Sequence, residues 1–263
     1  MAYYTTTDGV QLYFEEFGDG QPLLLVHGFG TTHDYYERNI PVLAESFHVV
    51  TLDLRGHGKS SSAKTGAHIS RLATDIHELL NHLDLNHVTF LGWSMGASIG
   101  WSYWELFQAD RLAKFIFVDE PELALDTPKN HWGFLDYNGL LELSEKLRAN
   151  LPLGMKNMIE NTQADPGMDT SDLVKASSTG NPDFQADLLI NHGVTDWHTV
   201  VKSITLPTLV ISGDGHFFNA DLIKAVHQDI PNSQFEYFEH FGHFLFFEDP
   251  EHFNQVVHDF TKN

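Results

Sequence analysis

The chain has 263 residues, 42% of them hydrophobic, and it contains no cysteine. Its 15 Lys and Arg against 36 Asp and Glu give a formal net charge of -21 at pH 7. A surface field of this sign repels nucleic-acid phosphates and anionic lipids, so we expect neither nucleic acid nor membrane as a partner. The lack of cysteine excludes disulfides, thiolate catalysis and cysteine zinc sites. The length suits one α/β domain with an insertion.

The first eight residues have neither the basic nor the apolar region of a signal peptide, and no long apolar run follows. A cytoplasmic protein is therefore expected. The 17 histidines are scattered along the chain instead of forming the close pairs that bind metal. We predict no metal and no cofactor. The sequence does not specify an oligomeric state.

The order of predicted elements indicates the fold class. The turn signal Asp8-Gly9 separates two alternating segments, which predicts a hairpin. Short runs rich in apolar and β-branched residues then alternate with segments of helical periodicity, as in a mostly parallel sheet. Strands are predicted at 3–6, 12–16, 23–26, 48–52, 88–91, 114–118, 208–211 and 234–238, and helices at 69–83, 97–107 and 251–261.

One long segment interrupts the alternation of strand and helix. It runs from 121 to 195 and contains several helical pieces, with Pro and Gly breaks at 151–154 and 165–167. We interpret it as a helical cap inserted after the sixth strand. The predicted α/β core is then 1–120 and 196–263, and the predicted cap is 121–195.

The sequence Gly92-Trp93-Ser94-Met95-Gly96 follows one predicted strand and begins a predicted helix. Strand, Gly-x-Ser-x-Gly and helix in this order are typical of a nucleophile elbow, which presents the serine on a tight turn. Ser94 needs a base to accept its proton, and His243, in Gly242-His243-Phe244 after the last predicted strand, is the candidate. His240 is the weaker candidate and is expected to end the strand.

These motifs, together with His27-Gly28-Phe29-Gly30 and the segment from Asp53 to Ser60, resemble the α/β-hydrolase superfamily. The chain is most similar to its serine esterase, cofactor-free perhydrolase and haloperoxidase-like branch. The resemblance implies an eight-stranded, mostly parallel sheet flanked by helices, with an antiparallel second strand. It also implies an oxyanion hole from the amides of Phe29 and Met95. His27 and the segment 53–60 are expected to support local structure.

Serine hydrolases of this family complete a catalytic triad with an acidic residue that orients the histidine, and here this chain departs from the family pattern. Members usually carry an Asp where this chain has His216, after the seventh strand. Asp119 is the preferred replacement, because it stands at the carboxyl end of the predicted sixth strand, where catalytic groups of open α/β sheets gather. Asp214 and Glu120 are the alternatives.

Together these residues predict a serine hydrolase that cleaves small to medium carboxylic esters through an acyl-enzyme. Perhydrolase, thioesterase, lactonase and carbon–carbon hydrolase activities use the same triad and stay as alternatives. The missing acid at position 216 leaves a further alternative, a non-catalytic receptor for small molecules on the same fold. An apolar substrate pocket is expected from the aromatic residues Trp93, Trp132, Phe217 and Phe244.

Overall fold

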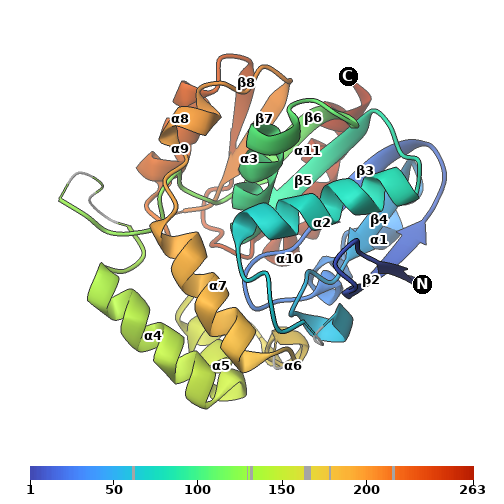
Figure 1. Ribbon diagram of the computed structural model, residues 1–263. Helices are drawn as coiled ribbons and strands as arrows, with labels where there is room; N and C mark the ends of the chain where they lie inside the picture. Colours follow the sequence, from blue (N-terminus) through green and yellow to red (C-terminus); the bar gives the residue numbers. More distant parts are fainter. Residues whose placement is uncertain (61–62, 129, 131–132, 163–166, 178, 215–216) are drawn as a thin grey trace.

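The computed structural model describes residues 1–60, 63–128, 130, 133–162, 167–177, 179–214 and 217–263. The described residues form an eight-stranded sheet in the order β1-β2-β4-β3-β5-β6-β7-β8 (Figure 1). Its strands are β1 (Ala2–Thr5), β2 (Gln11–Phe17), β3 (Gln21–Val26), β4 (Phe47–Leu52), β5 (Val88–Trp93), β6 (Leu112–Val118), β7 (Thr208–Ser212) and β8 (Ser233–Tyr237).

The sheet is parallel except at β2, which runs antiparallel to both of its neighbours, β1 and β4. The pairs β3–β4, β3–β5, β5–β6, β6–β7 and β7–β8 are all parallel. The predicted fold class, with its antiparallel second strand, is confirmed.

Successive residues of each central strand point to opposite faces of the sheet, so both faces carry a hydrophobic core. In β3, Leu24 and Val26 belong to one buried cluster, whereas Leu23 and Leu25 belong to the other. The first cluster includes residues of α2 (Ile69–His82), α3 (Met95–Phe107), α8 (His198–Val201) and α9 (Ala220–Asp229). The second cluster includes residues of α1 (Ile40–Leu43), α10 (Leu245–Glu248) and α11 (Pro250–Lys262). Figure 1 shows α2 and α3 in front of the sheet and α11 behind it.

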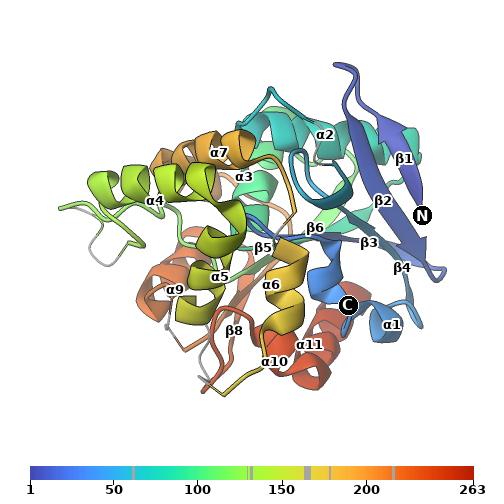
Figure 2. The same ribbon diagram turned by 90° about the horizontal axis from the view of Figure 1, so that it is seen from below.

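Between β6 and β7 the described chain forms α8 and, before it, the four helices of the insertion: α4 (Tyr137–Ala149), α5 (Leu151–Thr162), α6 (Ser171–Ser177) and α7 (Pro182–Val194). They gather at one end of the sheet (Figures 1 and 2). Side chains cap the N-termini of two of these helices. Asp136 accepts a hydrogen bond from the amide of Gly139 at the start of α4, and Asn181 accepts one from the amide of Phe184 at the start of α7. In the described part of the chain, no helix has the length and apolar character needed to cross a membrane.

Candidate active site at the carboxyl edge of the sheet

Ser94 lies between the end of β5 and the first residue of α3, in a backbone conformation that is strained for a residue with a side chain (φ 54°, ψ -131°). Its amide donates to the carbonyl of Val118 at the end of β6, 2.8 Å away. The flanking glycines permit this turn. A Cβ on Gly92 would lie 2.3 Å from the Gly96 carbonyl oxygen, and one on Gly96 would lie 2.4 Å from the Val26 carbonyl oxygen. The local structure of the elbow therefore requires both glycines.

His243 and Asp119 form a buried pair beside Ser94. The Nδ1 atom of His243 lies 2.7 Å from Oδ2 of Asp119, and the two residues are 4% and 3% exposed. Asp119 directly follows β6 with a left-handed backbone (φ 50°), and its Oδ1 accepts a 3.2 Å hydrogen bond from the amide of Gly213. An Nδ1–H donated to Asp119 leaves the lone pair on Nε2 of His243, which no described residue hydrogen-bonds. This is the tautomer that a general base needs.

The two alternative acids lie elsewhere. Asp214 accepts a hydrogen bond from the hydroxyl of Tyr237 and lies 3.9 Å from Nδ1 of His240, whose side chain is 81% exposed. Glu120 accepts a hydrogen bond from the hydroxyl of Ser98 at 3.1 Å. His216 lies outside the described residues. Of the three carboxylates considered from the sequence, the structure brings Asp119 to His243.

The amides of Phe29 and Met95 donate no hydrogen bond to any described residue. Met95 is the first residue of α3, and amides in the first turn of a helix have no intrahelical acceptor. Phe29 lies in the loop that follows β3, next to the elbow, since a Cβ on the preceding Gly28 would lie 3.0 Å from Cβ of Ser94. Two unpaired N–H groups near a nucleophile are the components of an oxyanion hole.

Two buried imidazoles join the Phe29 loop to the loop after β4. Nε2 of His27 accepts the amide of Leu54 at 2.9 Å, and Nε2 of His57 accepts the amide of Gly30 at 3.1 Å. Burial lowers the pKa of His27 to about 3 and the pKa of His57 to about 4, so both rings are neutral at pH 7. We call this pair of reciprocal contacts the His27–His57 clasp. It positions the loop that carries the Phe29 amide.

Arg55 anchors the second loop of the clasp. Its fully buried guanidinium makes two hydrogen bonds of 2.7 Å to Asp75 on α2 and two of 2.8 Å to Asp8 in the N-terminal hairpin. Such paired contacts fix orientation as well as charge. Arg55 and His57 of the segment 53–60 thus hold neighbouring loops in place.

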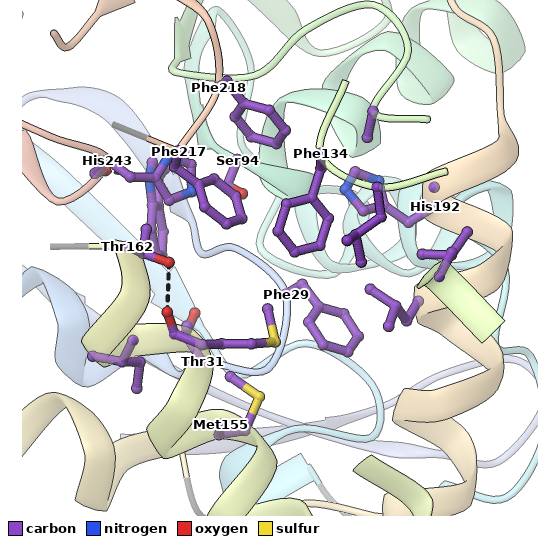
Figure 3. Close-up of a pocket in the computed structure, with 18 of the residues that line it drawn as sticks. Phe29, Thr31, Ser94, Phe134, Met155, Thr162, His192, Phe217, Phe218 and His243 are labelled. Carbon is purple, nitrogen blue, oxygen red and sulfur yellow. Dashed lines mark hydrogen bonds between the residues drawn. The ribbon is translucent and has the colours of Figure 1, made fainter. Parts of the chain in front are cut away.

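A pocket opens above Ser94 and His243, between the sheet and the inserted helices (Figure 3). The rings of Phe217 and Phe218 lie 4.7 Å and 5.5 Å from the His243 ring, centre to centre. The predicted pocket residues Trp93, Phe217 and Phe244 line it, and Trp132 lies outside the described residues. Its other lining residues include Phe29, Thr31, Tyr35, Phe134, Leu140, Met155, Met158, Thr162, Leu189, His192 and Phe218.

Sequence reasoning missed most of the residues that the inserted helices bring to the pocket. One local signal points to Met155. Gly30 has a left-handed backbone (φ 69°), and a Cβ there would lie 2.4 Å from the Met155 methyl group, so the glycine marks the close approach of α5. His192 follows an ordinary helical pattern in α7, and nothing in its neighbourhood along the chain indicates its place in the pocket.

Comparison with known proteins identifies the fold family. The model of the alpha/beta hydrolase fold family matches residues 21–250. A non-heme haloperoxidase from Rhodococcus erythropolis is 26% identical, covering 81% of each chain, and a bifunctional esterase/perhydrolase from Acinetobacter calcoaceticus is 25% identical, covering 81% of this chain and 82% of the relative. The structure of an esterase from Exiguobacterium antarcticum superposes with a TM-score of 0.94 at 24% identity, covering 99% of each chain. The chain belongs to the α/β-hydrolase family, in which its relatives include haloperoxidases and esterases.

Proposed function

We propose that the protein is a serine carboxylesterase in which Ser94 is the nucleophile, His243 the general base and acid, and Asp119 the orienting carboxylate. The observation that carries the proposal is the 2.7 Å contact between His243 and Asp119, in the same pocket as the strained Ser94. The esterase and perhydrolase activities named for a relative of similar length support it.

In the proposed mechanism, Ser94 Oγ attacks the ester carbonyl carbon while Nε2 of His243 takes its proton. The amides of Phe29 and Met95 stabilise the tetrahedral oxyanion. Collapse of this intermediate breaks the bond to the alcohol, which leaves with the proton from His243. Water, deprotonated by the same imidazole, then attacks the acyl-enzyme and releases the carboxylic acid and the free serine. Asp119 stabilises the imidazolium formed in each half-reaction.

Hydrolysis of p-nitrophenyl esters from acetate to decanoate tests the proposal. Ser94→Ala is expected to lower kcat by about 10⁶-fold, as loss of the nucleophile does in serine proteases. Ser102→Ala is the matched control, because it removes another buried hydroxyl from α3, the helix that follows Ser94, and this hydroxyl has no hydrogen-bond partner among the described residues. Equal turnover by wild type and Ser94→Ala, or no labelling of Ser94 by a fluorophosphonate probe, would contradict the proposal.

Perhydrolysis is the second candidate activity, favoured by the relatives that are named as haloperoxidase and esterase/perhydrolase. Hydrogen peroxide would replace water in the second half-reaction, so the acyl group leaves Ser94 as a peracid. Peracid formation from an acetate ester and hydrogen peroxide, followed by bromination of monochlorodimedone, measures this reaction. It requires Ser94, so Ser94→Ala is again the control.

A further inference from the structure

The pocket has mostly apolar walls, and the polar side chains that line it fall into two groups. The hydroxyl of Thr31 donates to the carbonyl of Gly28 at 3.0 Å, and the hydroxyl of Thr162 donates to the carbonyl of Met158 at 2.6 Å (Figure 3). Both hydroxyls are therefore occupied by backbone acceptors. The hydroxyl of Tyr35 and the indole N–H of Trp93 also donate to backbone carbonyls, those of Leu173 at 3.2 Å and His243 at 2.9 Å. Among the described lining residues, the polar side chains that remain are Ser94 and His243, which the proposed reaction uses, and His192, which it does not.

His192 enters the pocket from α7. Figure 3 shows its ring across the pocket from His243, with Ser94 and Phe134 between them. The residue is only 7% exposed, and its Nδ1 atom has no hydrogen-bond partner among the described residues. A buried ring nitrogen without a partner costs free energy, and this cost is recovered when a ligand supplies the missing hydrogen bond.

The carboxyl group of Glu120 lies next to the ring of His192. Its Oε1 lies 3.4 Å from Nε2 of His192 and accepts the hydroxyl of Ser98 at 3.1 Å. In the described part of the chain, Oε2 of Glu120 also has no hydrogen-bond partner. Ser98 stands one helical turn after Ser94 on α3, so this polar group is built on the same helix as the proposed nucleophile.

Burial favours the neutral form of both groups. Burial raises the pKa of the Glu120 carboxyl well above its ordinary value and lowers the pKa of His192 to about 4. In these favoured neutral forms, the acid and the imidazole offer no counter-charge for a carboxylate or an ammonium group. They match a neutral group that can both donate and accept, of which a hydroxyl is the simplest.

We propose that His192, positioned by Glu120, is a specificity-determining residue that binds a hydroxyl group in the part of the substrate remote from the scissile carbonyl. The preferred substrate class is thus a hydroxylated ester. This inference rests on the proposed esterase function and adds the substrate class to it.

The test compares kcat/KM for matched ester pairs that differ by one terminal hydroxyl. One set consists of p-nitrophenyl esters of four-, six- and eight-carbon acids with and without an ω-hydroxyl. The other set is butyl acetate and 4-hydroxybutyl acetate, which places the hydroxyl on the alcohol side. The readout is the ratio of kcat/KM within each pair, because a ratio does not depend on the amount of active enzyme. Three variants are compared with wild type: His192→Leu, His192→Gln and Thr162→Val.

Wild type is expected to prefer the hydroxylated member of at least one pair by about tenfold, the value of one well-formed hydrogen bond. His192→Leu should bring that ratio to one or below. His192→Gln retains hydrogen-bonding atoms and should keep part of the preference. Thr162→Val removes a pocket hydroxyl that is already bonded to the backbone, so it should leave the ratio at the wild-type value.

Two results would overturn the inference, and they are distinguishable. If wild type hydrolyses the esters with the same ratios as His192→Leu in every pair, the proposed esterase function stands and the role of His192 is wrong. If wild type hydrolyses none of them, the proposed function fails and the substrate class fails with it. Thermal melting shows whether each variant folds. If His192→Leu does not fold, the kcat/KM ratio of His192→Gln decides whether His192 binds the hydroxyl.

Discussion

The carboxylate of Asp119 lies 2.7 Å from the Nδ1 atom of His243, and it reaches the ring from the end of β6, whereas Asp214 after β7 is bonded to Tyr237. The two carboxylates therefore have different expected roles, although both are close to the carboxyl edge of the sheet.

Asp119→Asn is expected to lower ester turnover by about 10⁴-fold, because the amide favours the wrong imidazole tautomer and cannot stabilise the imidazolium. Steady-state kcat with p-nitrophenyl esters is the measurement. Asp214→Asn is the matched control and should change kcat by less than about tenfold. A reversed order of the two variants would move the acid to the loop after β7.

Changing His57 to Gln should make the stability of the protein less sensitive to acid. The pKa of His57 falls from an ordinary 6.5 when unfolded to about 4 when folded. Between these values the unfolded chain binds a proton that the folded chain does not, so wild type loses stability as pH falls from about 6.5 to 4, by about 1.4 kcal/mol per pH unit from this group.

Urea unfolding at intervals from pH 7 to pH 4.5 measures the effect as the difference in free energy of unfolding between wild type and His57→Gln. The difference should shrink as pH falls, since every other titrating group is shared by the two proteins. A constant difference across this range would show that His57 is not held neutral in the folded state.

Gly92→Ala is expected to destabilise the fold by at least about 3 kcal/mol, because the new Cβ would meet the Gly96 carbonyl at 2.3 Å and the backbone would have to move. Gly9→Ala is the control. Gly9 also has a left-handed backbone (φ 86°), but its Cβ would have nothing within 4 Å. That variant should lose only about 1 kcal/mol. Equal losses in chemical unfolding would mean that steric contact at the elbow is relieved at little cost.

Asp75→Asn should lower the free energy of unfolding by about 3–5 kcal/mol, because it leaves the fully buried Arg55 guanidinium short of one carboxylate. Asp8→Asn breaks the other pair, but the Asp8 side chain is 39% exposed and water replaces part of the interaction. A smaller loss is expected there. Chemical unfolding of both variants at pH 7 makes the comparison, and equal losses would contradict a special role for the buried pair.

The sheet could be predicted from the sequence because its determinants are local. The continuous Leu-Leu-Leu-Val run of β3, the three-and-four spacing of α2 and the glycines around Ser94 each occupy a short stretch of chain. Asp119 was a reasonable candidate for a similar reason, since the ends of parallel strands meet at one edge of the sheet.

The pocket could not be predicted in the same way. The contact between His192 and Glu120 joins α7 to the end of β6, and it depends on how the inserted helices pack. The same holds for Met155 of α5 against Gly30. Packing between helices is set by many side chains at once and leaves no fixed spacing in the sequence.

The carboxylate that contacts His243 comes from the end of β6 and not from the loop after β7. The loop after β7 instead contributes the rings of Phe217 and Phe218 to the pocket wall. The proposed catalytic carboxylate and these two rings of the pocket wall thus lie on separate loops. For protein engineering, positions 217 and 218 form a compact target for saturation mutagenesis. A library there can reshape substrate preference while the carboxylate–imidazole pair keeps its anchor on the sheet.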